Sequence, residues 1–288
     1  MRMAASKILI AGGSGLLGPY LVQEMRGSGN VATVSLSRGD LICDLTSRPQ
    51  TRELVASCRP HIVINAVGCP FPDACEGDPA MAYAVNRDVV ANLVSAMDGT
   101  GFFVQISTDH LYPDVIGPHA EKSVGPVNVY AASKLAGEVA ALKHPNPLVL
   151  RANFFGPSRS PHRKSFSDFF IDALRARKRI KGFSDIEFSP LHLETLARVL
   201  GQLVSERITG VYNLGSRHGM TKAAFILAGA DRLGLDRSLV EVVESDAFSF
   251  KARRPRDMRM DVSRIESVLG TPLPDTLSEI GKLCPGSG

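Results

Sequence analysis

The chain has 288 residues, 44% of them hydrophobic, with 33 basic and 29 acidic side chains and a formal net charge of +4. This length suits one large domain, or a nucleotide domain with a smaller lobe. The charge is too mild to indicate a nucleic acid partner, although it suits an anionic small ligand.

The five cysteines are scattered, without a C-x-x-C pair or clustered histidines, which indicates reduced thiols and no metal site. The N-terminal stretch "MRMAASKILIAGG" has an apolar run too short for a secretory signal, and no later stretch reaches membrane-spanning length. We therefore expect a cytoplasmic protein with no membrane partner.

Short apolar runs alternate with helix-length amphipathic segments over the first half, the pattern of a Rossmann-type, doubly wound parallel α/β sheet. The runs "KILIA", "HIVINAV" and "PLVLRA" are almost continuously apolar, as a sheet covered on both faces requires. The predicted strands span residues 7–11, 31–36, 61–67, 102–106 and 147–151, with a weaker one over 41–43.

The alternation of apolar runs and amphipathic segments ends after Arg151, where the loop "GPSRSPHRKS" precedes a predicted helix over 166–177. A further helix over 192–205 and a strand over 210–214 are expected to return to the sheet. The predicted organisation is a dinucleotide-binding domain over 1–155 with a returning segment over 189–215. A smaller, interleaved substrate-binding lobe is predicted over 156–188 and 216–288.

The first predicted strand is followed by "AGGSGLLG", in which Gly12, Gly15 and Gly18 open a helix. Glycines allow the backbone to approach a pyrophosphate, and the helix N-terminus offers free N–H groups. A plain structural turn is the alternative. The position after a first strand, with a second strand one βαβ unit later, favours nucleotide binding.

The choice of cofactor depends on the end of the second strand, "SLSRGD". Ser37 and Arg38 supply a hydroxyl and a guanidinium that suit a 2′-phosphate, so NADP is favoured over NAD. In the alternative, Arg38 is a solvated turn residue and Asp40 binds the ribose hydroxyls of NAD. Asp44 and Leu45 follow the third strand, where Asp44 either accepts from the adenine amine or caps a helix.

Two further stretches point to catalysis. "ISTDHLYP" places Ser107, Thr108 and Asp109 at the carboxyl end of a strand, where ligands of open α/β sheets bind. "YAASKLAGE" places Tyr130 and Lys134 four residues apart on one helical face. That spacing is common by chance, but its combination with the glycine loop and the strand end is specific.

With these motifs, the chain resembles the extended short-chain dehydrogenase/reductase family and, within it, the dTDP-4-dehydrorhamnose reductases. The resemblance covers nearly the whole length. It rests on "ILIAGGSGLLG", "RPHIVINAVG", "DPAMAYAVNRDVVANL", "VQISTDHLYP", "EKSVGPVNVYAASKLAGE", "GVYNLGSRHGMTK" and "RRPRDMRMDVSRI".

The resemblance implies that Tyr130 protonates the substrate carbonyl and that Lys134 holds the nicotinamide ribose. A free tyrosine has a pKa of about 10, so we expect the Lys134 charge to favour proton exchange near neutral pH. Thr108 would bind the carbonyl oxygen, and Asn86 would help to order the lysine; the alternative for Asn86 is a helix surface position.

The same resemblance assigns further residues to the two ligands, with Asp109 placed in the catalytic set. The additional residues assigned to the cofactor are Leu16, Leu17, Asn65, Ala66 and Val67. Those assigned to the substrate are Ser107, Asn153, Phe154 and Arg254.

Departures from the family pattern leave the sugar open. Related dehydratases carry Glu after the Thr-Asp pair, whereas this chain has His110, so dehydration is disfavoured. The reductases usually have a tryptophan that packs on the sugar, and this chain has no tryptophan. Phe154 and Phe155 are candidates to replace that surface, with burial in the core as the alternative.

The segment "KARRPRDMR" is rich in arginine, and the guanidinium fork suits a diphosphate. Although such runs are usually solvated, the resemblance favours Arg253, Arg254 and Arg256 as diphosphate contacts. For Arg159, Arg163 and Lys164, in the loop after Phe155, the solvated interpretation is preferred.

The sequence therefore predicts an NADP(H)-dependent reductase of a nucleotide-activated 4-keto-6-deoxy sugar, with NAD as the alternative cofactor. A homodimer is compatible with it. A second interpretation comes from "GMTKAAFILAGADRLGL" and "RRPRDMRMDVSRIESVLG", which resemble the C-terminal part of the methionine adenosyltransferase regulatory β-subunit. In that case the chain would bind NADP and modulate a partner enzyme.

Overall fold

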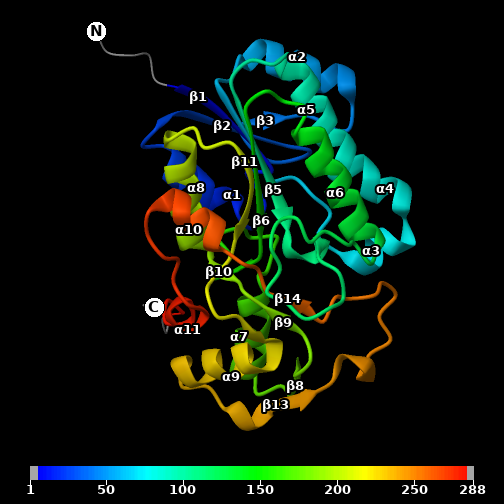
Figure 1. Ribbon diagram of the computed structural model, residues 1–288, viewed down its shortest axis with the longest axis vertical. Helices are drawn as coiled ribbons and strands as arrows, with labels where there is room; N and C mark the ends of the chain where they lie inside the picture. The colour runs from blue at the N-terminus through cyan, green and yellow to red at the C-terminus, as the bar shows by residue number, and fades with distance from the viewer. Residues whose placement is uncertain (1–5, 284–288) are drawn as a thin grey trace.

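The computed structural model describes residues 6–283 and is built around a central sheet of seven parallel strands (Figure 1). This confirms the predicted doubly wound α/β fold. From edge to edge, the strands are β11 (Gly210–Leu214), β6 (Pro147–Ala152), β5 (Phe102–Thr108), β4 (Ile62–Asn65), β1 (Ser6–Ala11), β2 (Gly29–Ser35) and β3 (Leu41–Ile42).

The strand bounds differ from the predicted ones by a few residues at the ends. β4 ends at Asn65 rather than at residue 67, because the Val67 N–H donates to Asn65 Oδ1 (3.1 Å). β2 begins at Gly29 and ends at Ser35, one residue before the predicted end. The two shortened ends, at Asn65 and Ser35, lie at the carboxyl edge of the sheet, whereas β2 starts two residues earlier than predicted.

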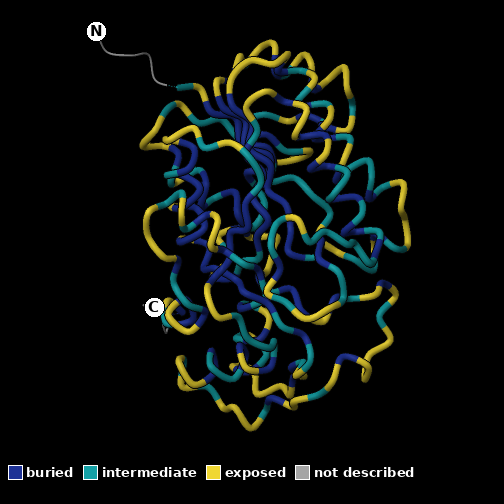
Figure 2. The backbone as a smooth tube through the Cα atoms, viewed as in Figure 1, coloured by how far each residue is buried: buried dark blue, intermediate teal, exposed yellow. Residues whose placement is uncertain are grey.

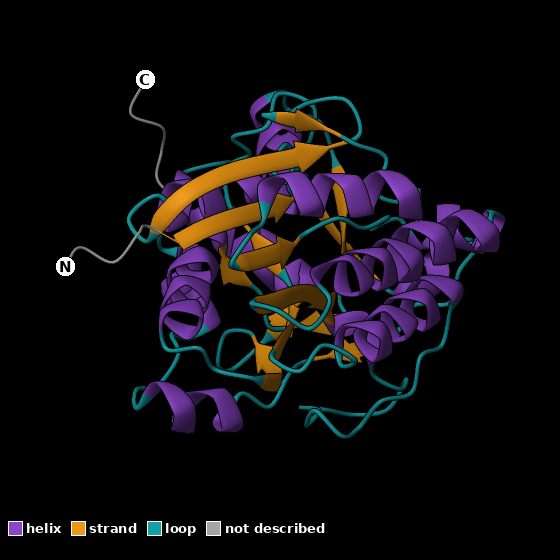
Figure 3. Ribbon diagram, turned by 90° about the horizontal axis from the view of Figure 1, so that it is seen from above, coloured by secondary structure: helices purple, strands orange, loops and turns teal. Residues whose placement is uncertain are grey.

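Helices cover both faces of the sheet (Figure 3). Successive strand residues point to opposite faces, so Ile8 and Ile10 pack into one core and Leu9 into the other. One face is covered by α1 (Gly18–Met25), α8 (Leu193–Ser205) and α10 (Ser263–Leu269). The opposite face is covered by α2 (Arg48–Cys58), α5 (Val89–Met97) and α6 (Val129–Ala141).

Beyond the carboxyl ends of the strands lies a smaller layer with its own apolar core, and buried residues fill the interior of both layers (Figure 2). Its centre is a group of phenylalanines, in which Phe225 packs edge-on against Phe155 and Phe188 at 4.7 and 5.3 Å between ring centroids. Its helices are α7 (Phe166–Arg175), α9 (Lys222–Leu233) and α11 (Thr276–Ile280). Its strands are β7 (Phe154–Phe155), β8 (Ile180–Phe183), β9 (Glu187–Phe188), β10 (Leu191–His192), β12 (Met220–Thr221), β13 (Val240–Val243) and β14 (Asp257–Met258).

The chain passes between the two layers more than once, since β11 follows α8 and pairs with β6 in the central sheet. The domain boundaries at residues 155, 189 and 215 stay a prediction. Within residues 6–283, no helix combines the length and apolar character needed to cross a bilayer. Short helical segments complete the fold: α3 (Pro72–Gly77), α4 (Pro79–Tyr83), the π-helical η1 (Ala84–Asp88), and the 3-10 turns η2 (Asp109–Leu111), η3 (Arg237–Leu239) and η4 (Ser245–Ala247).

Helix α6 is fixed in place by a cap, a close contact and an ion pair. The Asn128 side chain accepts from the Ala131 N–H (2.8 Å), which caps the helix. A Cβ on Gly137 would lie 2.2 Å from the Asn86 carbonyl oxygen, so only glycine allows this approach of α6 to η1. Glu138 accepts three hydrogen bonds from Arg151 of β6: Nε donates to Oε1 (2.9 Å) and Oε2 (3.2 Å), and Nη2 donates to Oε2 (2.7 Å).

The pair between Glu138 and Arg151 yields a stability prediction. Both side chains are buried, at 3% and 4% exposure, so Glu138→Ala leaves an unpaired guanidinium inside the protein. We expect a loss of about 3–5 kcal/mol in the free energy of unfolding, measured by urea denaturation.

As a control, Asp231→Ala removes the exposed ion pair with Arg237 and should cost less than about 1 kcal/mol. Equal losses in the two variants would contradict the role given to the buried pair.

Candidate functional site

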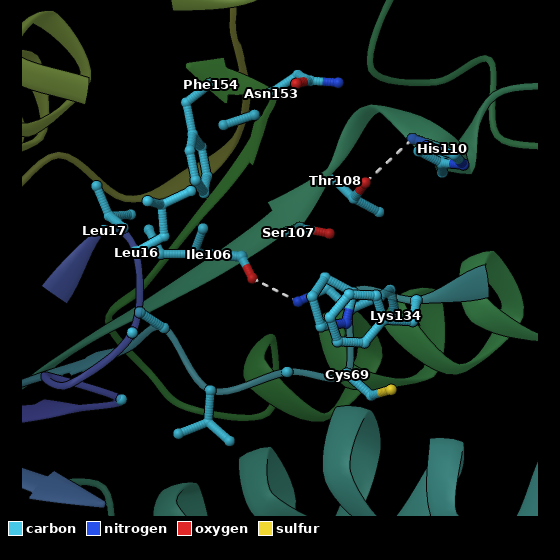
Figure 4. A pocket seen from close by; sticks show the side chains of 18 of the residues that line it. Leu16, Leu17, Cys69, Ile106, Ser107, Thr108, His110, Lys134, Asn153 and Phe154 are labelled. Carbon is cyan, nitrogen blue, oxygen red and sulfur yellow. Dashed lines mark hydrogen bonds between the residues drawn. The ribbon is translucent and has the colours of Figure 1, made fainter. Parts of the chain in front are cut away.

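A cavity of about 340 Å³ lies at the carboxyl ends of β1, β4, β5 and β6 (Figure 4). This volume is in the range of small-molecule sites, and its position is the one expected for ligands of an open α/β sheet. Many of the predicted residues line it together: Gly12, Gly15, Leu16, Leu17, Ala66, Val67, Ser107, Thr108, Asp109, Tyr130, Lys134, Asn153 and Phe154.

Tyr130 and Lys134 point from α6 towards the end of β5, as their spacing on one helical face predicted. Tyr130 is 7% exposed and Lys134 6%. The Lys134 ammonium donates to the Ile106 carbonyl (2.7 Å). Burial lowers the pKa of Lys134 to about 8, and the Glu138 carboxylate partly opposes this change.

The electrostatics of Tyr130 differ from the expectation. Burial raises the pKa of its phenol above the ordinary value, and the Thr108 side chain opposes this rise. The nearby Asp109 carboxylate adds to the increase. In this structure the phenol is therefore a firmly protonated group, because desolvation outweighs the hydrogen bond from Thr108.

Asn86 is an interior residue of η1, at 1% exposure, and does not lie on a helix surface. Its Oδ1 accepts from the Cys69 N–H (2.9 Å), and its Nδ2 donates to Ser133 Oγ (2.9 Å). Ser133 in turn donates to the Tyr130 carbonyl (2.8 Å). Asn86 therefore lies behind the cavity wall and joins the β4–α3 loop to α6.

Asp109 and Asn153 form a polar pair beside Thr108. Asn153 Nδ2 donates to Asp109 Oδ2 (2.6 Å), and Thr108 Oγ1 lies 3.3 Å from Asp109 Oδ1. Burial raises the pKa of Asp109 to about 6, although the hydrogen bond from Asn153 and the charge of Lys222 oppose this shift. This carboxyl is thus able to bind a ligand hydroxyl as donor or as acceptor.

Sequence reasoning missed Lys222, which begins α9 in the smaller layer. Its ammonium lies 3.9 Å from the centre of the Phe188 ring and 4.6 Å from that of Phe166. Burial lowers the pKa of Lys222 to about 8, and the Asp109 carboxylate partly opposes this change.

Burial and the charges of Lys222 and Arg254 lower the pKa of His110 to about 3, so His110 is neutral beside Tyr130.

The glycine loop fits a dinucleotide. Gly12 has a φ of +83°, and a Cβ there would lie 2.9 Å from the Ala66 carbonyl carbon. No side chain caps the first turn of α1, where Pro19 has no N–H and the Tyr20 and Leu21 N–H groups donate to the Leu17 carbonyl (3.1 Å each). Ser107 Oγ is buried at the cavity without a partner among residues 6–283. Gly18 does not line the cavity, because it packs directly on the Gly13 backbone.

Ser37 and Arg38 are exposed at the end of β2, outside the cavity lining. The Arg38 N–H donates to Ser35 Oγ (2.8 Å), and its guanidinium forms no ion pair within the described part of the chain. Asp40 Oδ2 accepts from both the N–H and the hydroxyl of Thr33 (2.8 Å each). The carboxylate is thus held against β2 while Arg38 is available.

Three other predicted cofactor contacts lie away from the cavity. Asp44 Oδ1 accepts from the Thr46 N–H (2.9 Å), and Ser47 precedes α2 in its place, so Asp44 is not the helix cap. Leu45 is 5% exposed because its apolar side chain packs in the core under α2. Asn65 Nδ2 donates to Gln105 Oε1 (2.8 Å), so its buried amide forms a hydrogen bond between β4 and β5.

The predicted diphosphate arginines are paired with acids outside the cavity. Arg254 binds Asp73 (3.0 Å), and Arg253 binds Asp114 (2.8 Å). Arg256 binds Asp246 (3.1 Å).

Arg163 and Lys164, which we expected to be solvated, are exposed and also belong to the residues that line the cavity, and Lys164 binds Asp172 (2.6 Å). Besides Lys134, the lysine and arginine side chains of the lining therefore come from the loop after β7. The third, Arg159, lies outside the lining and binds Glu194 (2.8 Å).

A comparison with protein families identifies the chain, because the model of the RmlD substrate binding domain matches residues 6–284. The chain belongs to the RmlD substrate binding domain family. This confirms the resemblance drawn from the sequence motifs.

Named relatives of this RmlD-family chain fall into two groups. It is 28% identical to a dTDP-4-dehydrorhamnose reductase of Burkholderia thailandensis, over 96% of this chain and 97% of the relative. It is 25% identical to methionine adenosyltransferase 2 subunit beta of Danio rerio, over 95% of this chain and 89% of the relative. Both interpretations of the sequence are thus represented among full-length relatives.

A solved structure shows the same fold. The dTDP-4-dehydrorhamnose reductase of Bacillus anthracis, in complex with NADP, superposes with a TM-score of 0.89 at 21% identity. The match covers 98% of this chain and 99% of that chain.

The lowered pKa of Lys134 predicts a pH dependence of NADPH binding. Lys134 is charged below pH of about 8 and neutral above it, so NADPH affinity should fall as the pH rises through that value. Calorimetric titrations between about pH 6.5 and about pH 9.5 would measure this change.

Lys134→Arg provides the control, because a guanidinium stays charged throughout that range. Its NADPH affinity should be independent of pH, whatever its absolute value. A wild-type affinity that is constant through pH of about 8 would show that the lysine charge is not used.

Proposed function

We propose that this chain is an NADP(H)-dependent reductase of a nucleotide-activated 4-keto-6-deoxy sugar. The observation that carries the proposal is the convergence of Thr108, Tyr130 and Lys134 with the glycine loop on one cavity. A firmly protonated phenol, a hydroxyl and a cation beside a dinucleotide loop suit carbonyl reduction.

In the proposed reaction, the chemistry that bound NADPH supplies is transfer of a hydride to the carbonyl carbon. Tyr130 donates its phenolic proton to the carbonyl oxygen as negative charge develops there. Because the pKa of Tyr130 is raised, its phenol is protonated before the hydride is transferred. Thr108 donates a hydrogen bond to the same oxygen, which stabilises the developing alkoxide.

Lys134 has two tasks in this proposal. Its ammonium, anchored at the Ile106 carbonyl, binds the nicotinamide ribose. Its charge also stabilises the phenolate that remains after Tyr130 gives up its proton. Asn86 acts as a positioning residue, because its hydrogen bonds to Cys69 and Ser133 hold the β4–α3 loop against the helix.

The sugar is assigned to the side of the cavity formed by Asp109, Asn153 and Phe154. The hydrogen-bonded carboxyl and amide suit sugar hydroxyls, and the half-buried Phe154 ring offers an apolar surface in place of tryptophan. Arg163, at the cavity wall, is assigned to the diphosphate, whereas Lys164 is already paired with Asp172 (2.6 Å). Arg254 is omitted from this role because Asp73 already neutralises it.

The regulatory function remains the second candidate, supported by the similarity to a methionine adenosyltransferase subunit. That function needs NADP binding but no proton donor. The reductase is preferred because the named relatives include dTDP-4-dehydrorhamnose reductases and because Thr108, Tyr130 and Lys134 line the same cavity.

The first test removes the proposed proton donor. Tyr130→Phe deletes one hydroxyl, so folding and NADPH affinity should survive while kcat falls by about 10²–10⁴-fold. The assay follows NADPH oxidation with a panel of 4-keto-6-deoxy nucleotide sugars.

The matched control is Tyr212→Phe in β11. It removes a hydroxyl that donates to the Thr209 carbonyl and does not line the cavity, so kcat should be unchanged. Full activity in Tyr130→Phe would refute the mechanism. If the wild-type protein binds NADPH but reduces none of the sugars, the regulatory function becomes the better proposal.

The second test concerns cofactor choice. Arg38 is exposed and free of acidic partners within residues 6–283, so we propose that it binds the 2′-phosphate of NADP. Arg38→Ala should weaken NADPH binding by about 1.5–3 kcal/mol and leave NADH binding nearly unchanged, as measured by calorimetry. Arg52→Ala, on the surface of α2, is the control for a change in net charge. Equal wild-type affinities for NADPH and NADH would exclude the assignment.

A further inference from the structure

Two cysteines lie together at the wall of the catalytic cavity. Cys69 lines the cavity in the loop after β4 and is partly exposed (Figure 4). Cys75, in α3, is completely buried. Cys75 Sγ donates to the Cys69 carbonyl at 3.6 Å, because the chain folds back where the Cys75 N–H donates to the Phe71 carbonyl (3.0 Å).

The pair is in direct contact with the catalytic tyrosine. Cys75 and Tyr130 belong to one small apolar cluster, against which Cys69 packs. Both sulfurs are also close enough for their charged forms to raise the pKa of Tyr130. The Cys69 side chain, in turn, contributes to raising the pKa of Cys75, with burial as the larger cause, to about 12.

From this geometry we infer that Cys69 and Cys75 form a reversible disulfide on oxidation by a peroxide, and that this bond switches the site off. Cys69 is the thiol that an oxidant entering the cavity meets first. Cys75 is shielded from solvent and acts as the resolving thiol. The loss of activity rests on the proposed function, whereas formation of the disulfide does not.

The chemistry balances with hydrogen peroxide as the oxidant. The Cys69 thiolate attacks one peroxide oxygen, forming a sulfenic acid and releasing hydroxide, which becomes water. The Cys75 thiolate then attacks the Cys69 sulfur, the S–S bond forms as the S–O bond breaks, and the oxygen leaves as hydroxide, which the proton released by Cys75 converts to water. Because the pKa of Cys75 is about 12, this second step should accelerate as the pH rises.

The bond would act on catalysis through Asn86. The Cys69 N–H is held by Asn86 Oδ1, and a Cβ on the preceding Gly68 would lie 3.6 Å from the Lys134 ammonium. Pulling the Cys69 sulfur towards α3 therefore moves backbone that touches both Asn86 and Lys134. A displacement of about 1 Å at such a site can cost about 10²-fold in rate.

The test treats the full chain with hydrogen peroxide and then blocks the remaining thiols. Intact mass and peptide mapping should show loss of two hydrogens and a linked Cys69–Cys75 peptide. NADPH-dependent reduction should fall by about 10²-fold and return after addition of dithiothreitol. Cys75→Ala should give no linked peptide, whereas Cys58→Ser, on α2, should behave as the wild type.

Two outcomes would overturn the inference. One is a Cys69 that is oxidised to the sulfinic acid without any link to Cys75. The other is a linked peptide with unchanged turnover and unchanged NADPH affinity, which would leave no switch. If the protein reduces no keto sugar at all, the mapping and NADPH calorimetry of oxidised and reduced protein still decide the question.

Discussion

The buried ion pair between Glu138 and Arg151 joins α6, the helix that carries Tyr130 and Lys134, to the central sheet. Arg151 occupies β6, next to the strand that ends in Thr108, and Glu138 lies one helical turn beyond Lys134. Together with the Asn128 cap and the close contact at Gly137, the pair fixes α6 against the sheet. The placement of Tyr130 and Lys134 at the cavity follows from it.

Because α6 is held against the sheet, its functional groups lose water, and their acidity changes in opposite directions. Desolvation raises the pKa of the Tyr130 phenol and lowers that of the Lys134 ammonium. Glu138 limits the second effect, so one carboxylate supports both the position and the charge of the lysine. A protonated donor beside a cation is the arrangement that reduction of a carbonyl requires.

Close backbone contacts also place the loops around the cavity. Gly137 lets α6 touch η1, and Asn86 of η1 then reaches the loop that carries Cys69. Gly12 similarly allows the first loop to approach Ala66 at the end of β4. Through the same contacts, the loop that carries Cys69 is bound to Asn86 and passes close to the Lys134 ammonium.

The sequence by itself determined the sheet, the glycine loop and the spacing of Tyr130 and Lys134, because these depend on local periodicity and on short-range geometry. Only the tertiary structure decided which arginine side chains are paired with acidic residues and which lie at the cavity. Arg254 meets Asp73, distant in sequence, while Arg163 reaches the cavity from a loop that looked merely solvated. The sequence also did not predict that Lys222 packs on Phe188, or that the Cys75 thiol donates to the Cys69 carbonyl. Charge pairing and burial depend on residues far apart in the chain, so they exist only once the two layers have packed together.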